Sequence, residues 1–231
     1  MERITSSQNL HFKQARTLAG SARERRKTRQ MLMDGTRLIG TYAAHFGLDD
    51  CMLLVSEQGA NRPAVQKLFE SAPPRSTHIL SDHLFVQITQ VETPEGIVAV
   101  ANIPRVEEKP SDDFRIVLDG VQDPGNLGGL LRTAAAAGAT SVYLGKGCAD
   151  AWSPKSLRGG MGAQFVLPLC EHVDLNMALA QFRGMVISTS PRARQSIYDL
   201  DLRGPVAMIF GNEGRGLADE VQAMANQLVE I

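Results

Sequence analysis

The chain has 231 residues, of which 43% are hydrophobic and 21% charged, and its formal net charge is −1. These proportions are ordinary for a globular protein and leave room for a buried core. The three scattered cysteines form no CxxC pair, which argues against a disulfide framework or a zinc site, and no apolar stretch approaches the ~18 residues of a membrane span. We therefore expect a soluble, cytoplasmic protein of one or two domains, with no membrane association and no metal.

The first thirty residues are strongly basic: they carry a net charge of +6, whereas the rest of the chain sums to −7. A cationic cluster of this density suits contacts with nucleic-acid phosphates, which dominate sequence-independent affinity. The densest part of the cluster is Arg23, Arg25, Arg26 and Lys27. The alternative is a helix face whose charges are simply solvated.

Hydrophobic periodicity in the first hundred residues predicts a compact αβ unit. The predicted elements are helices over 12–29, 30–46 and near 64–69, and strands over 51–55, 77–80 and 96–100. The segment IPRVEEKPSDD that follows contains two prolines and four acidic residues, which is typical of a linker. We therefore predict a first domain over 1–102, a linker over 103–113 and a second domain over 114–231.

After the linker, apolar strands alternate with amphipathic helices. Strands are predicted over 116–118, 141–144, 165–169, 185–188 and 206–210, and helices over 127–137, near 154–158, over 175–182 and over 217–225. This alternation predicts a parallel sheet covered by helices on both faces. Because ligands of such sheets bind at the carboxyl ends of the strands, we expect the chemistry in the loops that follow strands.

The first notable loop follows the strand at 116–118 and reads DGVQDPGNLGGLLRTAA. Pro124 and Gly125 predict a turn, and Asn126 is a candidate helix cap. Arg132 lies six residues beyond Asn126, so the two are not on the same helical turn. The GxGxxG and GxxxxGK[ST] fingerprints are absent. A phosphate or ribose site and a dinucleotide-type turn with an incidental arginine both stay open.

Two further loops are rich in glycine. In SPKSLRGGMGA, Ser153 is a predicted helix cap and Pro154 the first helical residue. Lys155 and Arg158, at i and i+3, share a helix face that can attract an anion or simply be solvated. In IFGNEGRGL, an apolar strand runs into three glycines around Glu213, which can expose backbone groups to a flat ligand or form a tight turn.

Together, these loops resemble the motifs of the SpoU (TrmH-like) branch of the SPOUT RNA methyltransferases. Residues 126–134 match the first family motif, NxGxxxRTA, and GNEGRGL matches the third. The segments ITSSQN, MLMDGTRLI and TPEGIVAV, with the basic helix, resemble the family's N-terminal substrate-binding domain. The resemblance covers nearly the whole chain. It implies an α/β fold in which a knotted, SPOUT-type parallel-sheet catalytic domain follows a small ribosomal-protein-like α/β RNA-binding domain.

The resemblance also implies an activity and a set of site residues. The activity is transfer of a methyl group from S-adenosylmethionine to a ribose 2′-hydroxyl of ribosomal or transfer RNA by a homodimer. Arg132 is implied as the catalytic arginine, with Asn126 beside it at the ribose and Glu213 beside the reacting centre. The implied cofactor-contacting positions are Thr189, Gly211 and Ile231. The implied RNA-binding residues are Arg23, Arg25, Arg26, Lys27, Lys155 and Arg158.

Two features depart from the family pattern. Gly160 stands where the family often has a serine, and the chain ends at LVEI, where family members continue with a Pro-Met step, an SLNV-type loop and a last helix. We therefore expect a catalytic domain that lacks the family's C-terminal tail. Two other interpretations are a catalytically silent RNA-binding or assembly protein on the same scaffold and, with less support because the fingerprint is absent, a nucleotide-binding oxidoreductase.

Overall fold

The computed structural model describes residues 2–71, 77–107, 114–190 and 193–230. The chain divides into two compact units: Met1–Pro104 with Asp150–Phe165, and Arg105–Ala149 with Val166–Ile231. The sequence analysis placed residues 150–165 in the second domain, so the structure differs from the prediction there. The segment joins the first unit through packing, since the Phe165 ring meets the Tyr42 ring edge-on with centroids 5.3 Å apart.

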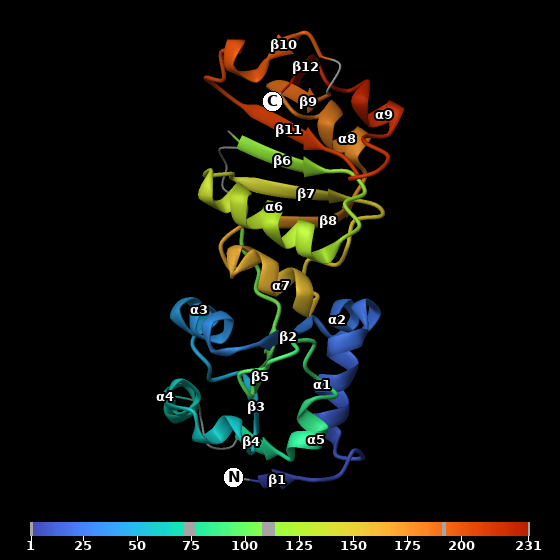
Figure 1. The fold of residues 1–231 in the computed structure, drawn as a ribbon. Coiled ribbons are helices and arrows are strands. Elements are labelled where there is room, and N and C mark those ends of the chain that lie inside the picture. The colour runs from blue at the N-terminus through green and yellow to red at the C-terminus, as the bar shows by residue number, and fades with distance from the viewer. Residues whose placement is uncertain (1, 72–76, 108–113, 191–192, 231) are drawn as a thin grey trace. The chain divides into compact units, whose positions relative to one another are not determined.

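The first unit is built on a five-stranded mixed sheet (Figure 1). Its strands, in spatial order, are β1 (Glu2–Ile4), β4 (Thr77–Leu80), β3 (Met52–Ser56), β5 (Ile97–Asn102) and β2 (Gln30–Asp34). β1, β4 and β3 run parallel, and β5 is antiparallel to both of its neighbours. The helices are α1 (Leu10–Gly20), α2 (Ala22–Thr28), α3 (Thr36–Phe46), α4 (Pro63–Ser71), α5 (Asp82–Phe85) and α7 (Pro154–Gly160), with the 3₁₀ helices η1 (Gly59–Asn61) and η3 (Ala163–Phe165).

The helix expected over 12–29 is two helices in the structure. The Ser21 side chain accepts a hydrogen bond from the Glu24 amide over 3.2 Å, so it acts as an N-cap and begins α2 as a new helix. The sequence analysis missed this break because a serine within a polar helical pattern is a weak signal.

The helix expected over 30–46 begins only at Thr36, because strand β2 precedes it. The three consecutive apolar residues Met31–Met33 are fully buried. A short run that is buried on both sides fits a strand better than an amphipathic helix. Gly35, with a φ of 96°, then turns the chain from β2 into α3.

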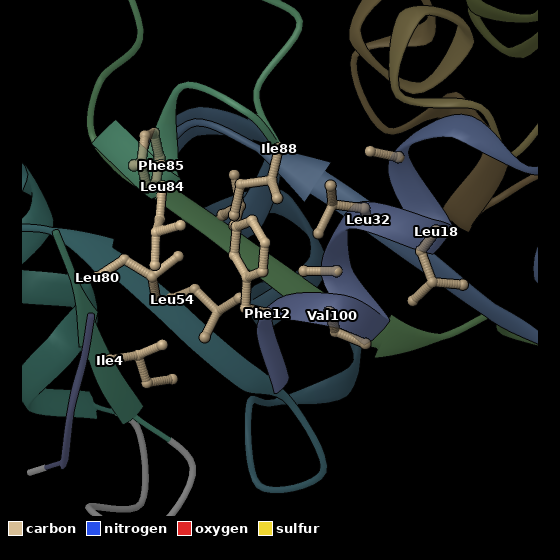
Figure 2. Packing of buried hydrophobic residues seen from close by; sticks show 13 residues of the cluster. Ile4, Phe12, Leu18, Leu32, Leu54, Leu80, Leu84, Phe85, Ile88 and Val100 are labelled. Atoms are coloured by element: carbon tan, nitrogen blue, oxygen red, sulfur yellow. The ribbon is translucent and has the colours of Figure 1, made fainter. Parts of the chain in front are cut away.

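A hydrophobic core lies between this sheet and its helices α1 and α5 (Figure 2). Phe12 of α1 and Phe85 of α5 are almost completely buried in it. The strands contribute Ile4, Leu32, Leu54, Leu80, Val98 and Val100. The burial of these two large aromatic rings against branched strand residues stabilises this unit.

The second unit is built on a seven-stranded sheet in which every neighbouring pair is parallel. Its strands, in spatial order, are β10 (Gln195–Ser196), β12 (Gln227–Glu230), β9 (Met185–Thr189), β11 (Val206–Phe210), β6 (Phe114–Leu118), β7 (Ser141–Gly145) and β8 (Leu169–Val173). The helices are α6 (Pro124–Ala136), α8 (Leu175–Ala180) and α9 (Asp219–Gln222), with the 3₁₀ helix η4 (Ile197–Asp199). The predicted parallel sheet is confirmed.

Alternate residues along the central strands face two separate apolar clusters. Ala207 and Ile209 of β11 pack with Leu175 and Leu179 of α8 and with Val221 of α9. The intervening residues Val206 and Met208 belong to a second cluster, which also includes Ile187, Val229, Ile197 and Leu200. This alternation follows from the two-residue period of a strand and covers the sheet on both faces.

Three elements of this unit differ from the prediction. The strand expected over 165–169 lies at Leu169–Val173, because Phe165 and Leu167 are buried outside the sheet. The helix expected over 217–225 is the short helix α9. Strand β12 was not predicted, since only Val229 of its four residues is buried and the pattern is therefore weak. In the described part of the chain, no helix combines the length and the apolar character that a membrane crossing requires.

Candidate functional site

The loops that carry the first and third motifs meet at one edge of the seven-stranded sheet. β6, β11 and β9 are parallel neighbours, so their carboxyl ends lie together, as predicted. The loops border a cavity of about 580 Å³, within the range of ~300–1,000 Å³ that is usual for small-molecule sites. The cavity is lined by Val121, Gly125, Asn126, Gly129, Leu130, Thr133, Thr189, Phe210, Gly211, Asn212, Glu213, Gly216 and Leu217.

Helix α6 begins at this cavity. The Asp123 carboxylate accepts hydrogen bonds from the amides of Gly125 and Asn126 over 2.7 and 2.9 Å, so Asp123 is the N-cap. Pro124 is the first helical residue, where its missing N–H costs nothing. The predicted cap role of Asn126 is therefore wrong, because Asn126 already lies inside the first turn of the helix.

The Asn126 side chain instead joins the first motif to the third. Its Nδ2 donates a hydrogen bond to Glu213 Oε1 over 2.9 Å. This bond lowers the pKa of the Glu213 carboxyl below its ordinary value. Glu213 is exposed, so it carries a negative charge at the mouth of the cavity at neutral pH. A carboxylate whose pKa is lowered is a weak proton acceptor, which argues against Glu213 as a general base.

Asn212 organises the third loop, and the sequence analysis did not single it out. Its Nδ2 donates to the Gly120 carbonyl over 2.8 Å, which ties this loop to the one after β6. Its Oδ1 accepts from the amides of Gly214 and Arg215, each over 2.9 Å. An asparagine in a glycine-rich loop is a recognisable turn signal, because its side chain can accept a hydrogen bond from the backbone two residues on, here from Gly214.

The predicted cofactor-contacting positions have different outcomes. Thr189 and Gly211 both line the cavity. Gly211 has no room for a side chain, since a Cβ there would lie 2.5 Å from the backbone of Gly216. Ile231 lies outside the described residues.

Arg132 lies on α6, exposed to solvent and outside the lining of the cavity. The residues of α6 that line the cavity are Gly125, Asn126, Gly129, Leu130 and Thr133, of which the last four form one stripe at i, i+3, i+4 and i+7. Arg132 lies seven residues beyond Gly125, which is about two helical turns, so it stands at the border of the face that lines the cavity. The structure therefore brings Asn126 and Glu213 together at the cavity and places Arg132 beside it.

Burial divides the basic cluster of α2. Arg25 is only 4% exposed. Its Nε donates to Asp150 Oδ2 over 2.7 Å, and its Nη1 donates to the carbonyls of Leu18 and Ala19. Arg25 is thus satisfied inside the first unit, and its predicted role in RNA binding is corrected to a structural one. The other three cations of the cluster, Arg23, Arg26 and Lys27, are exposed.

Helix α7 places its two cations in different surroundings. Ser153 caps the helix and Pro154 is its first residue, as predicted. Lys155 is exposed, whereas Arg158 is half-buried and lines a second cavity of about 270 Å³. That cavity also holds the buried Asp34, whose pKa is raised by burial and held down by Thr89 and by the Arg158 charge. Arg158 therefore faces acidic groups and does not form an open cationic face with Lys155.

Gly160, where the family often has a serine, lies against the side-chain amide of Gln164. A Cβ at Gly160 would lie 2.2 Å from Gln164 Oε1. Gln164 is fully buried, and its Nε2 donates to the carbonyls of Ala151 and Ser156 over 3.2 and 3.1 Å. The glutamine side chain thus fills the space that a serine side chain would need.

The structure also brings together side chains of the types that can bind a metal ion, a group that the sequence analysis did not identify. Among the described residues, Glu2, His11 and His78 form a group whose ligand atoms lie within 4.8 Å of one another. His11 and His78 are far apart in the sequence, so no motif spacing indicates the group. Only the pairing of distant segments creates it.

A parallel α/β sheet with a ligand-sized cavity at its carboxyl edge defines a small-molecule-binding enzyme fold. The model of the SpoU rRNA Methylase family matches residues 113–231, more than half of the chain. The chain therefore belongs to this family.

Similar proteins agree with the family. An uncharacterized tRNA/rRNA methyltransferase of Synechocystis is 32% identical over 99% of this chain and 84% of its own length. The 23S rRNA (guanosine(2553)-2'-O)-methyltransferase RlmP of Bacillus subtilis is 32% identical over 94% of this chain and 85% of its own. A crystal structure of an RNA 2'-O ribose methyltransferase has a TM-score of 0.81 and 29% identity, covering 99% of this chain and 89% of that one. The structure of AviRb from Streptomyces viridochromogenes in complex with AdoMet, at 23% identity and a TM-score of 0.82, covers 97% of this chain and 89% of its own and shows the same fold.

Proposed function

We propose that this chain is an S-adenosylmethionine-dependent RNA methyltransferase that methylates a ribose 2′-hydroxyl of ribosomal or transfer RNA. The observation that carries the proposal is the cavity at the carboxyl edge of the parallel sheet, where Asn126 of the first motif bonds to Glu213 of the third. The RNA 2′-O-methyltransferases among the similar proteins support the reaction type.

The lining of the cavity fits S-adenosylmethionine. Leu130 and Phe210 form an apolar part of the cavity wall that suits a flat adenine ring. At Gly129, an added Cβ would meet no atom within 4 Å, so this part of the wall has open space in front of it. The ionised Glu213 favours the positive charge of a sulfonium. The residues that we assign to cofactor binding are Thr189, Gly211 and Ile231.

When bound, S-adenosylmethionine would supply an electrophilic methyl group. Its transfer in line to the ribose oxygen would break the methyl–sulfur bond, release S-adenosylhomocysteine and pass the hydroxyl proton to a nearby RNA phosphate. Much of the rate then comes from holding the acceptor in line, and we assign that positioning to Asn126. Arg132 stabilises the negative charge that develops on the ribose oxygen, since a guanidinium stays protonated and cannot act as the base. The lowered pKa of Glu213 gives this residue an electrostatic role rather than a proton-accepting one.

Other features that the family resemblance implies belong to the same proposal. They are the knot in the catalytic domain, a homodimer, a cytoplasmic location and an N-terminal substrate-binding domain over residues 1–102. The exposed cations of α2 and the exposed Lys155 are the proposed RNA contacts, without Arg25, which is buried, and without Arg158, which faces Asp34. The mixed sheet and the basic helix of the first unit support its role in RNA binding.

The experiment combines methyl transfer with alkaline hydrolysis of the product. The chain is incubated with S-adenosylmethionine carrying a tritiated methyl group and with unmodified ribosomal and transfer RNA transcripts. Because alkaline cleavage of RNA needs a free 2′-hydroxyl, we expect the label in alkali-resistant dinucleotides. Label in mononucleotides indicates base methylation and contradicts the proposal. If the chain binds RNA but transfers no methyl group and shows no calorimetric binding of S-adenosylmethionine, the result favours the catalytically silent RNA-binding protein over the enzyme.

A further inference from the structure

We infer that the first unit carries a site for a divalent ion of the Zn²⁺ type, formed by Glu2, His11 and His78 and independent of the proposed methyl transfer. The ligand atoms of these three side chains all lie within 4.8 Å of one another. Two imidazoles and one carboxylate suit Zn²⁺ and its late first-row neighbours, whereas Mg²⁺ and Ca²⁺ prefer oxygen ligands alone.

Strand pairing brings the first two ligands together. β1 and β4 are parallel neighbours in which Glu2 lies opposite His78 and Ile4 lies opposite Leu80. Residues two apart on a strand point to the same face. Ile4 and Leu80 enter the core from one face of these strands (Figure 2). By the strand period, Glu2 and His78 project from the same face.

Helix α1 supplies the third ligand over the same face. Phe12 of α1 is buried in the core that contains Ile4 and Leu80, and His11 directly precedes it. The start of the helix is fixed because the Asn9 side chain accepts a hydrogen bond from the His11 amide over 2.9 Å. All three ligands thus stand on strands or on a capped helix, which are more rigid supports than loops.

The distances suit a tetrahedral ion. His78 Nδ1 lies 3.3 Å from Glu2 Oε2. Two ligand atoms at the usual Zn–N and Zn–O distances of a tetrahedral site are about 3.4 Å apart. The His11 and His78 rings are stacked with centroids 4.4 Å apart and planes at 26°, so coordination of one ion by both rings requires the His11 ring to rotate out of the stack. Glu2 is exposed, which leaves a fourth position open to water.

His78 is buried next to the Glu2 carboxylate. Its side chain is 9% exposed, and its Nδ1 lies 3.3 Å from Glu2 Oε2 without making a hydrogen bond of good geometry among the described residues. Buried polar atoms are nearly always paired, and an ion bound between this nitrogen and this oxygen would satisfy both.

The test is calorimetric titration of the full chain, without a polyhistidine tag and after removal of metal by a chelator. We expect one Zn²⁺ per chain, no binding of Mg²⁺, and a higher melting temperature with Zn²⁺, because the ion binds only the folded state. Glu2→Gln, His11→Ala and His78→Ala should each weaken Zn²⁺ binding at least about tenfold, the lower limit for loss of a supporting residue around a metal.

The chain offers matched controls. His45→Ala and His83→Ala remove exposed histidines outside the group and should leave Zn²⁺ affinity unchanged. If the buried His78→Ala variant unfolds, as circular dichroism will show, Glu2→Gln and His11→Ala still decide the question. Absence of Zn²⁺ binding by the parent chain, or equal affinity in the parent and in these two variants, overturns the site.

Discussion

The sequence analysis assigned an RNA-binding role to Arg25 on α2 and a catalytic role to Arg132 on α6, and the structure places these two side chains in different surroundings. On α2, Arg25 turns into the first unit, where Asp150 and two backbone carbonyls satisfy it. On α6, Arg132 stays exposed, beside the cavity at the carboxyl edge of the sheet. An arginine side chain therefore stabilises the fold in the first unit, whereas another stays exposed and available for chemistry in the second. The difference comes from the helix face on which each residue falls, which charge counting does not reveal.

The largest expected effect tests the buried side of this comparison. Arg25→Ala leaves the nearly buried Asp150 carboxylate without its partner, and breaking a buried pair of this kind costs about 3–5 kcal/mol. Urea unfolding will measure the change in the free energy of unfolding. Arg23→Ala, an exposed position on the same helix, should change it by no more than about 0.5 kcal/mol. Equal values for the two variants would mean that Arg25 has no structural role.

The exposed side of the comparison is tested by Arg132→Ala. Loss of one group that stabilises developing charge lowers turnover about 10²–10³-fold. The dissociation constant of S-adenosylmethionine should stay nearly constant, since Arg132 does not line the cavity. Single-turnover methyl transfer and calorimetry measure the two quantities. The control is Arg183→Ala, another exposed arginine of the second unit; unchanged turnover in Arg132→Ala contradicts the assigned role.

A smaller effect is expected from the cations that remain exposed on α2. Replacing Arg23, Arg26 and Lys27 together by alanine should lower RNA affinity roughly tenfold or more and reduce the slope of log affinity against log salt by about 0.7 per lost contact. Filter binding at several salt concentrations measures both. Replacement of Arg62 and Lys67, exposed cations elsewhere in the same unit, is the matched control. An unchanged slope in the triple variant would show that RNA does not contact α2.

The smallest effect is expected at Glu213. Glu213→Gln should weaken S-adenosylmethionine binding only about threefold, because an exposed charge is screened by water. Hydrogen bonding from Asn126 lowers the pKa of Glu213, so its charge is present above the ordinary glutamate pKa of about 4.3 and is lost only at lower pH. The dependence of turnover on pH between 6 and 9 should therefore have the same shape in the variant and the parent. If turnover of the parent rises with pH and that rise is lost in Glu213→Gln, Glu213 is the base.

Several features of the fold could be predicted from the sequence because their causes are local. The alternation of apolar strands with amphipathic helices after residue 114 indicated the parallel sheet, which the structure confirms. Ser153 and Pro154 indicated the start of α7 by capping chemistry alone. Strand β2 was mistaken for a helix because Met31–Met33 are buried on both sides, a condition that periodicity cannot distinguish from a helix.

By itself, the sequence determined that the motif loops follow strands, and parallel strands bring their carboxyl ends to one edge. It also determined the family of the chain. Only the tertiary structure decided that Asn126 reaches Glu213, that Arg25 is buried against Asp150 and that Glu2, His11 and His78 meet. Each of these contacts joins segments distant in the chain. Their partners depend on which helix face turns inward and which strands pair, and these choices are made by burial of the whole core rather than by local propensity.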